Sequence, residues 1–404
     1  MTKLDELIQE LCPDGVKYLP IPELFITRNG YTPSKANNEF WENGTIPWFR
    51  MEDIRENGRI LTTATQYVSE KAVKGKLFPA DSIIIATSAT IGEHALIKVP
   101  SLANQRFTYL TLKDEFKDCV DMMFVFYYCF RLDEYCKSHL NQGNFASVDM
   151  KQFAAFKFPV PPLPVQREIV RILDNFTELT AELTAELTAR KKQYAYYRDK
   201  LLSTNNSSVP VVELRDIVKK SCSGATPAKG NAEYYENGTI PWIRTQDVRF
   251  NEITEVNSYI TEKAVSETAT KWIPENCVIV AISGATAGRC AINKIKATTN
   301  QHCLNLIIDD SMALYRYVFH CLCSKYEELI SRKQGARGDL NSSLILSLPI
   351  PIPSLEVQKR LVEVLDNFDA ICSDLKIGLP AEIEARQKQY EYYRDKLLTF
   401  TPAD

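Results

Sequence analysis

Two ten-residue stretches of the sequence are nearly the same: WENGTIPWFR covers residues 41–50 and YENGTIPWIR covers residues 235–244. The match continues upstream, where GYTPSK at 30–35 corresponds to GATPAK at 224–229 with the same offset. Self-similarity at a fixed spacing indicates a repeated structural unit. Because 404 residues hold two or three ordinary domains, the chain has room for two copies of one domain.

The repeat also reaches the end of each half. FPVPPLPVQREIVRILDNF at 158–176 parallels LPIPIPSLEVQKRLVEVLDNF at 348–368. RKKQYAYYRDKLL at 190–202 parallels RQKQYEYYRDKLL at 386–398. The sequence therefore predicts a two-fold tandem duplication that covers most of the chain.

The first part of each copy has the pattern of a mixed domain. Short β-branched runs at 82–85 and 277–280 stand among Gly, Pro and Asn residues, which is typical of strands and turns. The segments 119–139 and 312–333 are rich in aromatic residues and have helical character. We expect an α+β globular domain in each half.

The second part of each copy is predicted to be a long helix. Apolar residues recur at intervals of three or four from Val165 to Leu201, which indicates a helix of roughly 38 residues. The matching stripe from Val357 to Leu397 offers a partner, so an antiparallel coiled coil would bury both stripes. Gly378-Leu379-Pro380 should break the second helix.

The predicted fold is α+β, with two tandem pseudo-symmetric globular domains linked by two long helices packed as an antiparallel coiled coil. The expected segments are a globular domain at 1–160, a central spacer helix at 161–206, a second globular domain at 207–350 and a C-terminal spacer helix at 351–404.

Composition excludes several classes of protein. No apolar run approaches the roughly 20 residues that cross a bilayer, and acidic residues interrupt the N-terminal MTKLDELIQELCPDG, so we expect a cytoplasmic protein without a membrane segment. The eleven cysteines form no C-x-x-C pair and the four histidines are scattered, which favours reduced thiols and no metal site. A net charge of −3 means that DNA binding would depend on local basic faces.

The order of these motifs resembles the specificity subunit of type I restriction-modification enzymes. The resemblance covers nearly the whole chain. Its most specific elements are Pro161-Pro162-Leu163 with Gln166, Ser354-Leu355 with Gln358, the paired 193–202 and 389–398 segments, and the G-x-T-P and IPW blocks. The resemblance implies that each globular part is a target recognition domain that reads one half of a bipartite, asymmetric double-stranded DNA sequence.

The same resemblance implies the partners. The helices would set the spacing and dock two modification (methyltransferase) subunits, and restriction subunits would join the full complex. The sequence contains neither a phosphate-binding loop nor an amino-methyltransferase motif. We therefore expect a non-catalytic chain without a cofactor, with S-adenosylmethionine, ATP and Mg²⁺ bound by partner subunits.

Two other classes of function remain open. A non-catalytic protein-interaction scaffold with duplicated ligand-binding domains predicts no sequence-selective DNA binding after assembly. A self-sufficient methyltransferase or nuclease predicts activity from the isolated chain, and the missing motifs argue against it.

Candidate DNA-binding residues lie in and beside the repeated blocks. Arg50 and Arg244 close the repeated peptide and could contact phosphate or guanine, although a salt bridge to Asp53 or Asp247 would explain them equally well. Lysines in the Thr-Pro loops suit phosphate contact, or are ordinary surface residues. These lysines are Lys35 and Lys229.

Positions where the matched halves differ are candidates for base reading, because two readers on one framework should differ where they touch bases. Drift in tolerant loops would give the same pattern. Gln and Asn pair well with adenine and Arg with guanine. The candidates are Ser88, Thr90, Gln105, Arg106, Gln142 and Asn144 in the first half, and Ser283, Thr286, Gln301, His302, Gln334 and Arg337 in the second.

The helices carry a separate set of candidates, for spacing or partner docking. Packing against the other helix, or against a modification subunit, explains the tyrosines better than base stacking, because two of each cluster fall on the apolar stripe. The candidates are Gln166, Leu183, Leu187, Tyr194, Tyr197, Gln358, Tyr390 and Tyr393.

Overall fold

The computed structural model describes residues 2–141, 146–203, 208–332, 339–374 and 376–403. The chain forms two compact units, one made of Met1–Glu182 with Glu384–Asp404 and the other of Leu183–Ile383. Each unit holds one globular domain and part of both long helical segments. The tandem α+β architecture predicted from the repeat is therefore confirmed.

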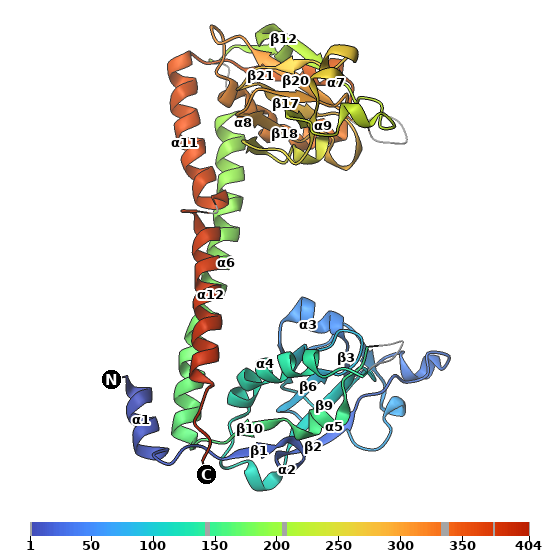
Figure 1. Ribbon diagram of the computed structural model, residues 1–404, viewed down its shortest axis with the longest axis vertical. Coiled ribbons are helices and arrows are strands. Elements are labelled where there is room, and N and C mark those ends of the chain that lie inside the picture. The colour runs from blue at the N-terminus through green and yellow to red at the C-terminus, as the bar shows by residue number, and fades with distance from the viewer. Residues whose placement is uncertain (1, 142–145, 204–207, 333–338, 375, 404) are drawn as a thin grey trace. The chain divides into compact units, whose positions relative to one another are not determined.

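The first unit begins with a helix, and short strands with a few helices among them follow (Figure 1). Its elements are α1 (Lys3–Leu11), β1 (Tyr18–Pro20), α2 (Ile21–Leu24), β2 (Phe25–Asn29), β3 (Ile46–Phe49), α3 (Met51–Asn57), β4 (Ile60–Leu61), β5 (Tyr67–Val68), β6 (Ser82–Ala86), β7 (His94–Ile97), β8 (Leu102–Ala103), β9 (Phe107–Leu112), α4 (Met122–Ser138), α5 (Met150–Ala155), β10 (Lys157–Pro159) and the start of α6 (Leu163–Leu201).

The second unit follows a similar order. After the end of α6 come β11 (Val211–Glu213), β12 (Val218–Ser223), β13 (Ile240–Ile243), β14 (Asn251–Ile253), β15 (Tyr259–Ile260), α7 (Glu262–Glu267), β16 (Trp272–Ile273), β17 (Val278–Ala281), β18 (Cys290–Asn293), β19 (Ala297–Thr299), β20 (Cys303–Ile308), α8 (Tyr315–Ser324), α9 (Tyr326–Ser331), α10 (Ser342–Leu346), β21 (Pro349–Pro351) and α11 (Leu355–Ser373), followed by the start of α12 (Leu379–Leu397).

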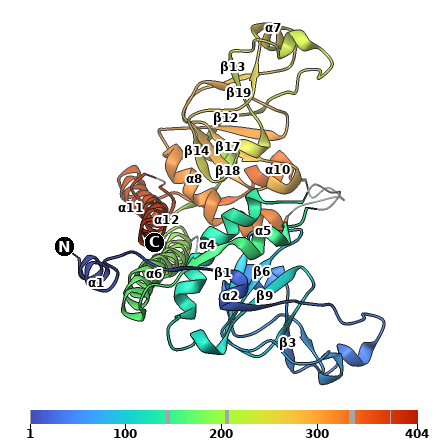
Figure 2. The ribbon, with the colours of Figure 1, turned by 60° about the horizontal axis from the view of Figure 1, so that its bottom comes forward.

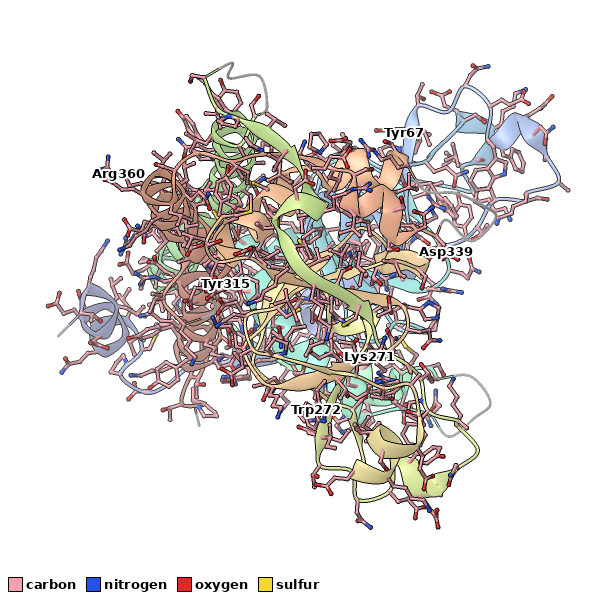
Figure 3. All side chains as sticks on the ribbon, turned by 90° about the horizontal axis from the view of Figure 1, so that it is seen from above. Tyr67, Lys271, Trp272, Tyr315, Asp339 and Arg360 are labelled. Carbon is pink, nitrogen blue, oxygen red and sulfur yellow. The ribbon has the colours of Figure 1, made fainter. Side chains whose placement is uncertain are left out.

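The large sheet has the same strand order in both domains, and the small sheet of the second domain has one additional strand, β16. A five-stranded sheet has the order β2-β9-β6-β7-β4 in the first and β12-β20-β17-β18-β14 in the second. A smaller sheet has the order β5-β3-β8 in the first and β15-β13-β19-β16 in the second. Figure 3 labels residues of these small sheets, Tyr67 on β5 and Trp272 on β16.

The central strands are buried on both faces, which explains their unbroken apolar sequence. On β6, Ile83 and Ile85 pack in the cluster that includes α4, whereas Ile84 and Ala86 pack against Trp48 and the small sheet. Alternate residues of a strand point to opposite faces. On β17, residues 278 and 280 pack with α8, and residues 279 and 281 pack on the opposite face.

The long helices pack as predicted. Helix α6 has 39 residues. In the first unit its N-terminal part lies beside α12, where the rings of Phe176 and Tyr393 stack with centroids 5.5 Å apart. In the second unit its C-terminal part lies beside α11, with the rings of Tyr197 and Phe368 6.4 Å apart. In each unit the two segments run in opposite directions, which confirms the antiparallel pair (Figure 1).

The second helical segment is interrupted where the sequence predicts. Helix α11 ends at Ser373 and α12 begins at Leu379. Pro380 lies in the first turn of α12, where its missing N–H removes no helical hydrogen bond. None of the helices in the described part of the chain combines the length and apolar character needed to cross a bilayer.

The first unit also contains the C-terminal segment of the chain. The N–H of Val16 donates to the carbonyl of Thr401 (2.8 Å), and the N–H of Ala403 donates to the carbonyl of Val16 (2.9 Å). Figure 2 shows the C-terminus close to the N-terminal segment that follows α1. Backbone hydrogen bonds therefore hold the C-terminal segment to the N-terminal segment of the first unit.

Candidate functional site

The Gly-x-Thr-Pro loop of each domain lies directly on the C-terminal end of β8 or β19. A Cβ atom added to Gly30 would lie 2.3 Å from the carbonyl oxygen of Asn104, and one added to Gly224 would lie 1.8 Å from that of Thr299. Only glycine permits this approach. The loop is thereby fixed against the Asn-Gln turn in both domains.

The tryptophans of the repeated peptide are part of this support. Trp48 and Trp242 are buried, and their indole N–H groups donate to the carbonyls of Tyr31 (3.0 Å) and Ala225 (3.2 Å) in the Gly-x-Thr-Pro loops. Both tryptophans are therefore core residues. In the preceding turn the positive φ belongs to Asn43 (51°) and Asn237 (56°).

Arg50 and Arg244 are half-buried at the end of β3 and β13. The aspartates three residues later do not pair with their side chains but accept the backbone N–H of the arginines, at 2.7 Å for Asp53 and 2.8 Å for Asp247. The Nε–H of each guanidinium is buried without an acceptor among the described residues. Arg50 also donates to the hydroxyl of Thr65 (3.0 Å), and Glu52 lies 3.9 Å from its Nε.

The Asn-Gln turn exposes two side chains in each domain. The amide oxygen of Asn104 accepts the N–H of Arg106 (3.0 Å), and that of Asn300 accepts the N–H of His302 (3.1 Å). This hydrogen bond shapes the turn so that the intervening glutamine and the next residue face solvent. The hydroxyl of Thr32 donates to Oε1 of Gln105, and Thr226 makes the same bond to Gln301.

The loop after the central strand joins this turn. The N–H of Thr87, next to Ser88, donates to the carbonyl of Arg106 (2.9 Å), and the N–H of Ile282, next to Ser283, donates to that of His302 (2.9 Å). The two predicted polar loops are therefore neighbours in both domains. Thr90 and Thr286 lie further along the same loops and are partly exposed.

In the second domain these groups line a surface cavity of about 560 Å³. Four of the predicted residues line it, Lys229, Arg244, Gln301 and His302, together with Thr226 of the Gly-x-Thr-Pro loop. Thr226 and its counterpart Thr32 are not among the functional residues predicted from the sequence. The recurrence of threonine at the same place in both copies was the available signal. Lys35 is exposed in the first domain.

Four predicted contact residues remain. Gln142, Asn144, Gln334 and Arg337 lie outside the described residues. The segments beside them do reach the site, because the N–H of Val148 donates to the carbonyl of Thr87 (2.9 Å) and the N–H of Leu340 donates to that of Ile282 (2.8 Å).

Two helical residues have a different role from the one expected. Gln166 is fully buried and bonds to the N–H of Asp121 (2.8 Å) and the carbonyls of Cys119 and Pro161 (2.8 and 2.6 Å). Gln358 makes the equivalent bonds to Leu314, Met312 and Pro353 (2.9, 3.1 and 2.9 Å). Their side chains do not reach the surface, which corrects their assignment to a docking surface. Each glutamine fastens the helix to its own domain.

The remaining helical candidates differ in how exposed their side chains are. Tyr390 is buried and Tyr393 stacks on Phe176, whereas Tyr197 is exposed to 41%. Leu183 and Leu187 are half-buried. The partner-docking role of these residues stays a prediction.

A charged network holds the helices to the second domain. Nε2 of His320 on α8 lies 2.7 Å from Oδ1 of Asp366 on α11, and Arg316 donates to Oδ2 of the same carboxylate and to Glu252. The hydroxyl of Tyr194 on α6 lies 3.4 Å from Nδ1 of His320. Burial would raise the pKa of Asp366, but hydrogen bonds from His320 and Arg316 outweigh it and hold the pKa below its usual range.

The matching contact in the first domain uses a neutral donor. The hydroxyl of Tyr127 on α4 donates to Oδ1 of Asp174 on α6 (2.6 Å). Burial, followed by the bond to this carboxylate, raises the pKa of Tyr127. Among the described residues, no group of three or more His, Cys, Asp or Glu side chains is arranged to hold a metal ion.

Comparison with known proteins decides the family. The sequence profile described as "Type I restriction modification DNA specificity domain" matches residues 13–190 and again residues 206–385. The chain belongs to this family. Each specificity domain thus spans one globular domain and the helical segment that follows it.

Named specificity subunits extend this result. The chain is 42% identical over 390 residues to the type I restriction enzyme EcoprrI specificity subunit of Escherichia coli, with 93% of each chain covered. It is 38% identical over 276 residues to the EcoR124I/EcoR124II specificity subunit of Escherichia coli, covering 65% of this chain and 68% of the relative.

Solved structures agree on the fold. A chain from a structure of complex assembly and conformational transition of the type I R-M system aligns with a TM-score of 0.70 at 16% identity, covering 96% of this chain and 98% of that chain. The HsdS subunit from Thermoanaerobacter tengcongensis aligns with a TM-score of 0.55 at 16% identity, covering 96% and 97%.

Proposed function

We propose that this chain selects the DNA target of a type I restriction-modification complex, with each globular domain reading one half of a bipartite, asymmetric duplex sequence. The observation that carries the proposal is the duplicated site. Both domains bring together an arginine, an Asn-Gln turn and a polar loop on one framework. The exposed residue that follows the glutamine differs, Arg106 in one domain and His302 in the other.

The chain would act without catalysis of its own. Methyl transfer, ATP hydrolysis and cleavage would take place on two modification subunits and on restriction subunits, which would bind S-adenosylmethionine, ATP and Mg²⁺. The absence of the corresponding motifs in the sequence supports this division of labour. A cytoplasmic location, where such a complex would meet DNA, stays a prediction.

Methylation mapping tests the proposal. The chain is coexpressed with its modification subunit in a host free of DNA methylation, and methyladenine is mapped across the genome. A bipartite motif is expected, and exchanging residues 207–350 for another recognition domain should change one half of it only. Unmethylated DNA from a demonstrably assembled complex would contradict the proposal and favour a protein-interaction scaffold.

The helices are proposed to set the distance between half-sites. Thr180–Leu187 contains two Thr-Ala-Glu-Leu units within the continuous helix α6. Removing one unit shortens a helix by about 6 Å, and one base pair rises about 3.4 Å. Deletion of Thr180–Leu183 is expected to change the spacing by about one or two base pairs without changing either half-site. The same methylation map provides the measurement, and an unchanged spacing would contradict this role.

A further inference from the structure

The two domains make one polar contact identically at the edge of the site. Thr32 donates its hydroxyl proton to Oε1 of Gln105, and Thr226 does the same for Gln301. Both threonines belong to the loops fixed by Gly30 and Gly224. The side chain of Gln105 or Gln301 therefore cannot rotate without breaking its hydrogen bond to the threonine. Each carboxamide is therefore oriented before any ligand binds.

This orientation matters for what the glutamine can recognise. Reading adenine requires a glutamine to accept a proton from N6 through its oxygen and to donate one to N7 through its amide nitrogen, in the plane of the base. The threonine occupies one of the two acceptor positions of Oε1 and restrains the orientation of the amide. The group left to a ligand is mainly the Nε2–H₂ donor, and a donor calls for an acceptor such as a phosphodiester oxygen.

The electrostatic surroundings fit an anionic ligand. The cavity at Gln301 is lined by Lys229 and Arg244, and its described lining contains no carboxylate. Phosphate contacts are favoured where cationic groups gather and are made by neutral donors as well as by lysine and arginine. The neighbouring residue His302 is exposed, and its Nε2 lies 3.2 Å from Nε2 of Gln301.

We propose that Gln105 and Gln301 hold a phosphodiester oxygen of the DNA backbone through Nε2–H, and that reading at this turn falls to the next residues, Arg106 and His302. The inference rests on the proposed DNA-reading function. It replaces base recognition by the glutamines, because a Thr–Gln pair that is the same in two domains suits a feature that both half-sites share. Every half-site offers a phosphate, whereas the bases differ.

The experiment uses the complex assembled from the full chain and its modification subunit, with duplexes that carry the mapped target. Gln301→Met removes both polar atoms of the side chain at similar size, and Gln301→Glu keeps the acceptor for Thr226 but removes the donor. Gln246→Met, at an exposed glutamine of the same domain, is the matched control. Dissociation constants are measured at several salt concentrations on the target, on duplexes with each base pair of the second half-site changed, and on duplexes with single methylphosphonates.

Gln301→Met is expected to weaken binding about 3- to 10-fold, the loss of one hydrogen bond, and by the same factor on the target and on every base-substituted duplex. The salt dependence should not change, because a neutral donor releases no counterion. One methylphosphonate position should abolish the penalty, since the variant and the DNA change remove the same contact. Gln301→Glu should bind at least as weakly, and Gln246→Met should bind like the unmodified complex.

Two results would overturn the inference. A penalty that disappears when one particular base pair is changed would make Gln301 a base reader. A Gln301→Met complex that binds like the unmodified complex would mean that the glutamine serves the loop alone. Either result is distinct from failure of the proposed function, in which the unmodified complex itself would not discriminate between the target and the base-substituted duplexes.

Discussion

The two units build the loops around the Asn-Gln turn with the same residues, but they hold their long helices with different ones. Trp48 and Trp242 bond to the same loop, and two matched threonines bond to matched glutamines. At the helices, a tyrosine bonds to Asp174 in one unit, whereas a histidine and an arginine meet Asp366 in the other. Residues stay the same where both copies perform the same task, and differ where their surroundings differ.

The outer face of the helix beside each domain also differs in its surroundings. In the first unit α1 covers α6: Lys3 lies 3.1 Å from Glu168, and Leu4 packs in the same cluster as Val165. The second unit has no matching helix among its described residues, so Val357, the counterpart of Val165, is exposed to 42%. The counterpart of Glu168 is Arg360, which projects outward from α11 (Figure 3).

The largest expected effect is the loss of stability on substitution of the glycine in the Gly-x-Thr-Pro loop. Gly224→Ala would place a Cβ 1.8 Å from the carbonyl of Thr299, so the loop must move. We expect a loss of about 3 kcal/mol in the stability of the second domain, the upper end for overpacking. Hydrogen exchange across residues 208–332 provides the measurement.

Gly230→Ala is the control for this change, because a Cβ at Gly230 meets no atom within 4 Å. It should leave exchange nearly unchanged. If Gly224→Ala were tolerated equally well, the loop would not be fixed against the turn, and the shared framework would lose its main physical explanation.

The second prediction compares the two helix contacts. Asp366→Ala removes hydrogen bonds to His320 and Arg316, and Asp174→Ala removes the bond from Tyr127 alone. Hydrogen bonds to charged groups contribute about 1.5–3 kcal/mol, so we expect losses of about 2–3 kcal/mol in the second unit and about 1.5 kcal/mol in the first. Chemical denaturation followed by exchange in each unit measures both. Equal losses would show that the charged network adds nothing to a single hydrogen bond.

Much of this architecture is predictable from the sequence. The offset of the repeat gives the two domains, the apolar stripe gives α6, and Gly378-Leu379-Pro380 gives the break before α12. These features are local, since each depends on periodicity or on the backbone preferences of a few residues. The burial of both tryptophans also follows from local pattern.

Contacts that depend on the backbone conformation at one position, or on packing between distant segments, are less predictable. The sequence suggests an ion pair between Arg50 and Asp53, but the structure has a hydrogen bond from the backbone N–H of Arg50 to the Asp53 carboxylate. This bond depends on the φ and ψ angles at the end of β3. The buried role of Gln166 depends on where α4 begins, 45 residues away from it in the sequence. Covering of α6 by α1 depends on packing between segments about 165 residues apart. Periodicity within one segment carries no information on such pairs.

Substitution of the matched valines Val165 and Val357 compares the covered face of α6 with the exposed face of α11. Val165→Ala empties space in a buried cluster, and a loss of about 1–2 kcal/mol is expected for the first unit. Val357→Ala changes an exposed side chain, and its effect in the isolated chain should stay within about 0.5 kcal/mol. Denaturant titration of the two variants measures the difference. A comparable loss at Val357 would mean that the isolated second unit covers this face after all.

The smallest effect concerns the pH dependence of α1. Hydrogen bonds from Arg171 lower the pKa of Glu168 to about 2 from 4.5; burial opposes this shift and Lys3 adds to it. A carboxylate with a lowered pKa contributes stability that is present above pH 4.5 and is lost as the pH falls toward 2. Because Lys3 is largely exposed, the contribution to holding α1 is about 1 kcal/mol or less.

Hydrogen exchange of residues 3–11 between neutral pH and pH 2 checks this prediction, after correction for the intrinsic dependence of exchange on pH. Protection of α1 should weaken with acid in the unmodified chain and change less in Glu168→Gln. Arg360→Gln alters the matched, exposed position of α11 and should leave α1 unaffected. If Glu168→Gln retained the full acid response, another group would hold α1 on α6. The charge difference between Glu168 and Arg360 would then not account for the covered face of the first unit.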